Sequence, residues 1–509
     1  MKQPSYLRSF MKLGLSLLFM HTAFAQGYDD PLSIQGLDRT NLPSAASRGA
    51  GGLTIGIQND AALLLSNPAS LQTLKGIQVS LGGVQQYSNA NQVQQFGPLK
   101  YYSNFSLLME GLTGYIPNPD SNHIGGTPGD SVQRPFDGIG PNWSRSKNRT
   151  QPIQVLIGVP FSVGDMKFAA GAGVVNYADL TQYYQNNNVL TPSILSVRPS
   201  PFPLPSNVLT QDARWFQYSR MRDGQIRGYG AAVSGAITDE ISAGISGMIL
   251  KGSTDDFEQH TGRGRLTFYA NYFRLDSVYS HIVRVGTSDY KGQEFTFSAA
   301  YRGKYVTVGI VANPPMTITR DYNANILVDT TGVPITTVDI GQDKVKLPWR
   351  GTVGLSIAVK ENLNLGFEYE VRSYASAVHS NAGDPTYGHI LQSAHLDSVV
   401  PANNPWLSSS VFHVGAEYTP VEWLVVRAGV RGQVEAFEPE GNPISGEPVS
   451  YSIYSLGCGV LFGPARLNVT YEYGRMKYQD VWGGAISLNQ ETRQAIVADL
   501  AYELPWRLF

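Results

Sequence analysis

The chain has 509 residues, a formal net charge of -2 and only 15% charged residues, against about 25% in an average globular domain. Its 28 Tyr, 20 Phe and 7 Trp argue against disorder, which requires high net charge and few aromatic residues. The near-neutral charge offers no basic face for nucleic acid. A single cysteine, Cys458, excludes an intramolecular disulfide, and no Cys/His spacing suggests zinc. We therefore expect an ordered protein with no nucleic-acid partner, no metal and no cofactor.

The first 25 residues have the pattern of a secretory signal peptide. Basic residues precede an apolar run at residues 13–20, and Ala23 and Ala25 place small residues where a signal peptidase reads the chain. A membrane anchor needs about 20 apolar residues, whereas this run stops at His21. We predict cleavage after Ala25 and export of the remaining chain. No later run is long and apolar enough for a transmembrane helix.

Residues 26–75 are predicted to form a compact segment separate from the rest of the chain. This segment lacks strand alternation, and small residues dominate it. Glycine permits close backbone approach and positive φ, and Asn-Pro favours a turn. A plug, or hatch, inside a barrel needs both properties; the alternative is a mobile periplasmic tail. The motif residues of this candidate hatch are Arg48, Gly49, Gly51, Asn67, Pro68 and Ala69.

From residue 76 onward, short segments with two-residue periodicity alternate with stretches rich in Gly, Pro, Asn, Asp and Ser. In residues 350–359, for example, Val353, Leu355 and Ile357 share one face of a strand. Applied throughout, this pattern predicts fourteen strands. They are residues 77–87, 153–159, 166–177, 226–237, 241–250, 293–301, 305–311, 350–359, 362–371, 411–418, 422–431, 451–461, 465–473 and 493–502.

The connections between these strands alternate between tight turns and long or medium loops. An even-stranded outer-membrane barrel has this arrangement, with short periplasmic turns and longer extracellular loops. A sheet in the hydrocarbon core must also close, because no water satisfies its edge. We therefore predict an all-β fold, a fourteen-stranded antiparallel transmembrane β-barrel over residues 76–509 with the N-terminal hatch at residues 26–75. A soluble sandwich has no reason to keep one end systematically short.

The inward faces of the last six predicted strands carry charges of both signs. The candidate ligand-binding or lumen residues are Glu368, Glu417, Arg427, Arg431, Arg466 and Glu472. In one interpretation their arginines hold an anionic head group or the hatch by charge-assisted hydrogen bonds. In the other, the charges form a self-neutralising ladder that only tolerates water. Arg48 of the hatch is a candidate partner for one of the carboxylates.

The predicted loops near residues 88–150, 178–225 and 252–291 are rich in aromatic residues. Exposed apolar clusters often mark binding sites, so these residues are candidates for a groove that first captures a hydrophobic molecule. Packing of one loop against another is the alternative. The candidate groove residues are Trp215, Phe216, Phe268 and Tyr272.

Three N-terminal segments, S-R-G-A-G-G at 47–52, N-D-A-A at 59–62 and N-P-A-S-L at 67–71, resemble the signature of the FadL family of outer-membrane transporters. The segment L-P-W-R-G-T-V-G-L at 347–355 is similar to the family's C-terminal strands. The resemblance implies a hatch-plugged barrel in the outer membrane of a diderm bacterium. It further implies passive uptake of hydrophobic compounds such as long-chain fatty acids, released through a gap in the barrel wall.

The same signature occurs in PorV-like barrels, which serve protein secretion, so a secretion partner or a structural surface protein is the alternative function. Transport predicts an enclosed apolar pocket beside the hatch, whereas a secretion role predicts a wide lumen and a protein-sized external apolar patch. Enzymatic motifs such as G-x-S-x-G, H-E-x-x-H or a P-loop are missing from the sequence.

Two further expectations concern the barrel wall and its partners. Gly171 and Gly173 in the third predicted strand are candidates for a local kink; their alternative role is small-residue packing against the hatch. The expected partners are outer-membrane lipid, a hydrophobic small-molecule ligand and the barrel-insertion machinery. The terminal Phe509 resembles the recognition signal that such machinery reads.

Overall fold

The chain forms one antiparallel sheet that closes on itself, because β1 pairs with both β2 and β18. The computed structural model describes residues 36–37, 44–96, 140–191, 209–269, 273–329, 332–381, 406–435, 449–482 and 485–504. In chain order the strands are β1 (Ile77–Phe96), β2 (Trp143–Val163), β3 (Met166–Asp179), β4 (Gln182–Thr191), β5 (Leu209–Ala236), β6 (Ile241–Tyr269), β7 (Phe273–Arg302), β8 (Val306–Asn313), β9 (Met316–Asp329), β10 (Ile335–Leu347), β11 (Arg350–Lys360), β12 (Leu363–Arg372), β13 (Val378–Asn381), β14 (Ser409–Val421), β15 (Leu424–Val434), β16 (Ser450–Phe462), β17 (Ala465–Trp482) and β18 (Ala485–Leu504).

These eighteen segments make fourteen barrel strands, because four barrel strands are each split into two segments. β3 and β4 both pair with β5, and β8 and β9 both pair with β7. The next barrel strand consists of β10 and β11, of which β10 pairs with β9 and β11 pairs with β8. The one after it consists of β12 and β13, of which β12 pairs with β11 and β13 pairs with β10. The predicted all-β, fourteen-stranded antiparallel barrel is thus confirmed, and every predicted strand lies in the wall.

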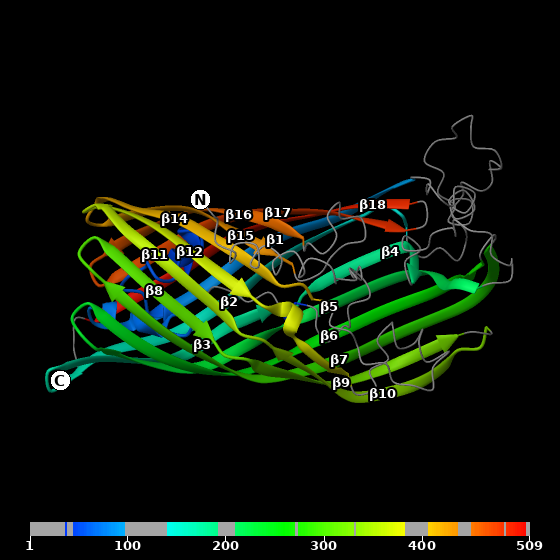
Figure 1. The fold of residues 1–509 in the computed structure, drawn as a ribbon, viewed down its shortest axis with the longest axis horizontal. Helices are drawn as coiled ribbons and strands as arrows, with labels where there is room; N and C mark the ends of the chain where they lie inside the picture. The colour runs from blue at the N-terminus through cyan, green and yellow to red at the C-terminus, as the bar shows by residue number, and fades with distance from the viewer. Residues whose placement is uncertain are drawn as a thin grey trace, which may run out of the picture.

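Several strands are much longer than a membrane requires. β5, β6 and β7 have 28, 29 and 30 residues, whereas a tilted transmembrane strand needs about 9–11. Together with β9 and β10 they extend beyond the remaining strands at one end of the barrel (Figure 1). The predicted loops at 178–225 and 252–291 are therefore wrong over most of their described residues, and strands also cover 88–96 and 143–150 of the predicted loop at 88–150. Beyond the bilayer a strand needs no apolar outer face, so the alternation that marks it in sequence is lost.

The outer surface of the barrel is apolar at membrane level. On β11, Val353, Leu355 and Ile357 are 51%, 38% and 41% exposed, while the intervening Ser356 is buried. Tyr418 points outward in the same way, as expected for an interfacial aromatic belt. The wall thus presents lipid-compatible side chains outside and polar ones inside. Within the described ranges, no helix has the length and hydropathy to cross a bilayer.

Residues 44–74 run inside the barrel and are called here the luminal segment. They form α2 (Ala45–Gly49), η1 (Ala61–Leu63) and η2 (Pro68–Thr73). α2 contacts β15 to β18, η1 contacts β1 and β2, and η2 contacts β2, β3 and β5 to β7. The segment appears in blue inside the barrel, near the end where the strand connections are short (Figure 1).

Three sequence predictions lie outside the described residues. They are the signal peptide at residues 1–25, the groove residue Tyr272 and the terminal Phe509; parts of the predicted hatch (26–35 and 38–43) and of the predicted loops (97–139 and 192–208) also lie outside them.

Candidate functional site

The luminal segment fits closely because the wall presents glycine where the segment touches it. A Cβ atom added at any of ten wall glycines would contact the luminal segment. This glycine belt comprises Gly158, Gly171, Gly230, Gly244, Gly309, Gly354, Gly366, Gly415, Gly429 and Gly457, on ten different strands. At Gly354, for example, the added atom would lie 2.6 Å from Ile55 Cδ1. The belt makes room for the segment all around the wall, so the lumen is filled at this level.

The closest approach is between two backbones, at Gly415 and Gly429. A Cβ atom at Gly415 would overlap the carbonyl group of Ala50, and one at Gly429 would overlap the backbone nitrogen of Gly51. Gly51 itself has φ 72°, a conformation that favours glycine. The motif glycines of the predicted hatch therefore serve this close approach.

Glu368 on β12 anchors the middle of the luminal segment. Its Oε1 accepts the backbone N–H groups of Thr54 and Ile55, both at 2.6 Å, and its Oε2 accepts the Thr54 hydroxyl at 3.1 Å. The carboxyl group is buried. A buried carboxylate requires such partners, so the wall and the segment satisfy each other at this point.

Glu472 on β17 anchors the first helix of the segment. Its carboxylate accepts a hydrogen bond from Arg48 Nε at 2.9 Å and is also paired with Arg431 of β15. Arg48, a motif residue of the hatch, thus meets a wall carboxylate that the sequence nominated. His413 on β14 adds a further contact, because its Nδ1 lies 3.0 Å from the carbonyl oxygen of Gly51. The carbonyl can only accept, so Nδ1 is the donor.

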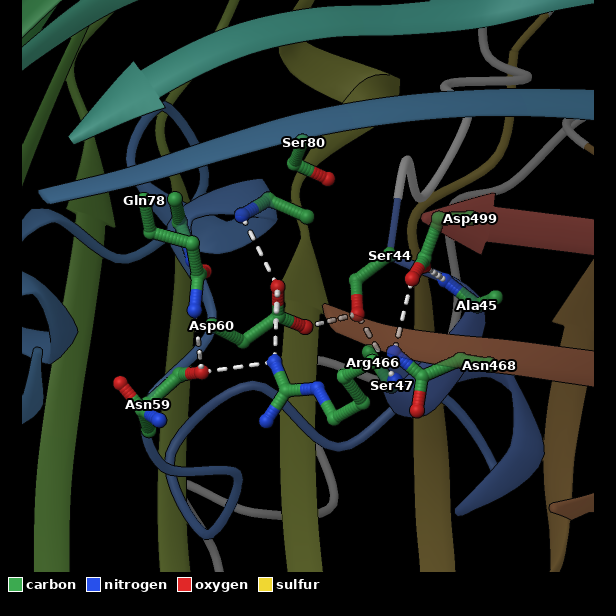
Figure 2. A network of polar contacts seen from close by, with 12 residues as sticks. Ser44, Ala45, Ser47, Asn59, Asp60, Gln78, Ser80, Arg466, Asn468 and Asp499 are labelled. Carbon is green, nitrogen blue, oxygen red and sulfur yellow. Dashed lines mark hydrogen bonds and ion pairs between the residues drawn. The ribbon is translucent and has the colours of Figure 1, made fainter. Parts of the chain in front are cut away.

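A second network joins the start of the luminal segment to its middle, at Asn59 and Asp60, and both to the wall (Figure 2). Ser44, the N-cap of α2, donates to Asp60 Oδ2 at 2.5 Å. Asp499 on β18 accepts the backbone N–H of Ala45 at 2.7 Å, at the N-terminus of that helix. Arg466 on β17 donates to the carbonyl oxygen of Asn59 at 2.7 Å. The segment is therefore folded onto itself and held by the wall.

The last two nominated lumen residues pair with each other. Arg427 Nε donates to Glu417 Oε2 at 2.8 Å, and its Nη1 donates to Asn468 Oδ1 at 3.1 Å. All six lumen residues consequently face inward, and each forms a hydrogen bond to the wall or to the luminal segment. The second motif of the hatch also contacts the wall, because Ala69 N donates to Ser298 Oγ at 2.8 Å.

A cavity of about 280 Å³ lies on top of the luminal segment, whose Arg48, Thr54 and Leu65 contribute to its lining. Its lining includes apolar residues, among them Val175 and Met248. The lining also carries paired charges, including Arg350 with Glu294 and Arg372 with Glu370. The cavity is thus amphipathic rather than apolar as the transport prediction required. Its wall charges largely neutralise one another, as the ladder interpretation expected.

The cavity reaches a place where the barrel ladder is incomplete. β2 and β3 pair only as far as Gln154 opposite Val175, and no pairing joins the rest of β2 to β3 or β4 among the residues described. Side chains cross this region, here called the β2–β4 seam. The bridges are Arg149 to Asp179 (2.7 Å), Lys147 to Asp223 (2.8 Å) and Trp143 Nε1 to the carbonyl oxygen of Gln185 (3.1 Å). Lys147, Arg149 and Asp179 also line the cavity.

The interruption in the third barrel strand does not lie at the glycines expected to kink it. The strand shifts register between Asn176 and Ala178 and is interrupted before β4. A Cβ atom at Gly171 would lie 3.2 Å from Leu64 Cδ2 of the luminal segment. Gly171 therefore has the alternative role, packing against the segment, and Gly173 faces Leu156 of the neighbouring strand.

The predicted loop groove lies largely in strands. Trp215 and Phe216 belong to β5, and Phe268 belongs to β6. Phe216 is fully buried, with its ring centroid 4.3 Å from that of His260. It is therefore an interior residue and not part of an exposed loop. For Phe216 the prediction of an exposed groove residue is therefore wrong.

Sequence reasoning missed the glycine belt and the cavity-lining pairs of the upper wall. The sequence does contain a signal for the belt. Each of its glycines occupies an inward position of a predicted strand, close to the short-turn end. The pairs Arg350–Glu294 and Arg149–Asp179 have no corresponding signal in the sequence, because the two residues of each pair lie on different barrel strands. Only the register of the closed sheet brings them together.

No protein-family profile and no curated protein matches this chain. Solved structures do resemble it. A Pseudomonas aeruginosa FadL homologue aligns with a TM-score of 0.56 at 15% sequence identity, covering 92% of this chain and 99% of that one. The P. putida toluene transporter TodX aligns with a TM-score of 0.51 at 14% identity, covering 92% of this chain and 100% of that one. At such identities the likeness concerns the fold.

Proposed function

We propose that this chain, which has the fold of FadL-type transporters, forms a passive channel for hydrophobic compounds in the outer membrane of a diderm bacterium. The observation that carries the proposal is the position of the cavity. It lies directly on the luminal segment and extends to the β2–β4 seam, where side chains replace the backbone ladder. A ligand in this cavity has the segment below it and a weak part of the wall beside it.

The size and lining of the cavity indicate the kind of ligand. Its volume of about 280 Å³ is near the lower end of small-molecule pockets, roughly 300–1,000 Å³. Val175, Tyr177 and Met248 contribute apolar surface to the lining. Because the charges of the lining are already paired, the driving force for binding is burial of apolar ligand surface. A compact hydrophobic compound fits these properties; a long-chain fatty acid is one candidate within this class.

The luminal segment acts as a hatch in this proposal. The glycine belt and the anchors at Glu368 and Glu472 hold the segment across the lumen, between the cavity and the short-turn end. Passage therefore requires either a shift of the segment or a lateral exit. The β2–β4 seam supports a lateral exit, since its opening breaks side-chain bridges rather than a backbone ladder.

The secretion-partner alternative receives less support from the same features. A polypeptide needs a wide lumen, whereas the luminal segment fills this one at the level of the glycine belt. The exposed apolar side chains that alternate along the wall suit lipid contact rather than a localised docking patch.

Uptake of the fluorescent hydrophobic probe N-phenylnaphthylamine by cells with and without the protein tests the proposal. Met248 lines the cavity, so replacing it by the larger Trp reduces the space for a ligand and should slow uptake. The neighbouring Ile249, which is 53% exposed on the outer face, provides the matched control Ile249→Trp and should leave uptake unchanged. Equal uptake with and without the protein, or fractionation of the protein away from the outer membrane, would overturn the proposal.

A further inference from the structure

Three neighbouring barrel strands are interrupted at the same level. The last continuous rung joins Asn313, Arg350 and Arg372 across β8, β11 and β12. Pairing resumes at Met316 opposite Leu347, in β9 and β10, and at residue 346 of β10 opposite residue 378 of β13. Between these rungs lie residues 314–315, 348–349 and 373–377. This region is called the three-strand break.

Prolines account for the break between the first two strands. The register is unchanged across it, so Pro315 stands opposite Pro348 and Pro314 opposite Trp349. Proline has no backbone N–H to donate and is otherwise confined to strand edges and bulges. In the third strand, residues 374–376 form the turn η4 (Tyr374–Ser376) in place of a strand. The ladder is therefore absent here because of the local sequence.

The three-strand break lies at the outer boundary of the membrane. β11 and β12, which run from the short-turn end to the break, have 11 and 10 residues. A tilted transmembrane strand needs about 9–11 residues, so both strands are used up in crossing the hydrocarbon core. The break is thus at the level of the lipid head groups, where backbone groups without ladder partners still reach water.

The two faces of the break differ in polarity. Outside, Phe295, Trp349 and Val371 are 50%, 55% and 43% exposed and form an apolar rim. Inside, Asn313 and Arg350 of the last rung line the cavity, while Leu347, Tyr374 and Ala377 belong to a buried apolar cluster. Asn313 Nδ2 donates to Thr296 Oγ1 of β7 at 2.8 Å, which closes part of the gap with a side chain. An amphiphile at this level would place its apolar part against the outer rim and its polar head against the inner one.

We propose that the three-strand break is a lateral inlet, through which amphiphilic compounds dissolved in the outer leaflet enter the cavity. The inference rests on the proposed function and adds a route to it. The inlet and the β2–β4 seam are separated in the sheet by β5, β6 and β7, and the cavity is lined from both sides. A compound can therefore enter the cavity from the membrane through the three-strand break and leave the cavity through the β2–β4 seam.

A reversible cross-link tests the inlet. Pro315→Cys and Pro348→Cys, in a Cys458→Ser background, place two cysteines at facing positions so that oxidation closes the break. The control pair is Ile357→Cys with Leu365→Cys, which face each other in the intact ladder of β11 and β12. Uptake of pyrene-labelled decanoic acid by cells should fall several-fold on oxidation of the first pair only and recover on reduction.

The outcomes separate the inlet from the proposed function. If unmodified protein does not accelerate uptake at all, the proposed function fails. If it does, and the oxidised Pro315/Pro348 pair still takes up the probe at the unmodified rate, the inlet alone is wrong. A second variant, Pro315→Val with Pro348→Thr, restores the missing backbone donors without a cross-link and should also slow uptake. Unchanged uptake in this folded variant, checked by its heat-modifiable mobility in gels, would likewise contradict the inlet.

Discussion

Arg48 and Glu472 are 424 positions apart in the sequence, yet Arg48 Nε donates to the Glu472 carboxylate at 2.9 Å. The same carboxylate is paired with Arg431 of the wall. All three side chains are at most 12% exposed. One acidic residue thus fixes both a wall arginine and the first helix of the luminal segment, and it is the point at which the docking of that segment is most easily altered.

Replacing Glu472 by Gln should loosen the luminal segment. The variant leaves two arginine head groups without their carboxylate, and breaking a buried pair costs roughly 3–5 kcal/mol. Hydrogen exchange of the amides in residues 44–74 should accelerate accordingly. The control is Asp239→Asn, since Asp239 is 86% exposed in its pair with Lys167 and such pairs contribute about 0–1 kcal/mol. Equal exchange in the two variants would show that Glu472 does not hold the segment.

Replacing Gly415 by Ala should displace the luminal segment by overpacking. The new methyl group would overlap the carbonyl group of Ala50, and overpacking typically costs about 1–3 kcal/mol. Single-channel recordings in planar bilayers should then show a larger ion conductance than the unmodified protein. Gly351→Ala is the control, because a Cβ atom there meets nothing closer than 3.9 Å. An ion conductance of Gly415→Ala equal to that of the unmodified protein would contradict the role of the glycine belt.

The membrane level of β11 can be checked with arginine on the outer face. Leu355 is the middle residue of β11 and points outward. Arginine at the bilayer midplane of a barrel costs about 2–4 kcal/mol, and about 0–1 kcal/mol near an interface. Leu355→Arg should therefore lower the unfolding free energy in urea much more than Tyr305→Arg, which is placed at a short-turn end. Equal losses would mean that the strand crosses the membrane at another level.

The membrane-spanning part of the fold was predictable from the sequence because lipid imposes a periodic pattern. On β11 the apolar positions Val353, Leu355 and Ile357 alternate with small or polar ones, and the structure confirms that they face outward. The upper part of β5 has no such pattern, since residues 216–220 are buried on both faces of the strand and mix aromatic with polar side chains. The sequence therefore predicts it as a loop although it is a strand.

The candidate site was predictable where a motif or a strand face identified it. Glu368, Arg431 and Glu472 follow from the inward faces, and Arg48 follows from the segment resembling the FadL signature. The partners of these residues depend on the register between strands, which the sequence leaves open. Pro314 and Pro315 end a predicted strand correctly, but the sequence gives no indication that the same barrel strand resumes as β9.

The bridges of the β2–β4 seam should control lateral release. Arg149 Nη1 donates to Asp179 at 2.7 Å, and Lys147 Nζ donates to Asp223 at 2.8 Å, in place of backbone hydrogen bonds. The double variant Lys147→Ala with Arg149→Ala removes both bridges while leaving the glycine belt and the luminal anchors intact. If release through the seam limits transport, uptake of N-phenylnaphthylamine should rise in this variant. Lys167→Ala, which removes an exposed pair at a short turn, should not change it. Unchanged or slower uptake in the double variant would show that the two bridges do not limit release, and would place the exit elsewhere in the wall.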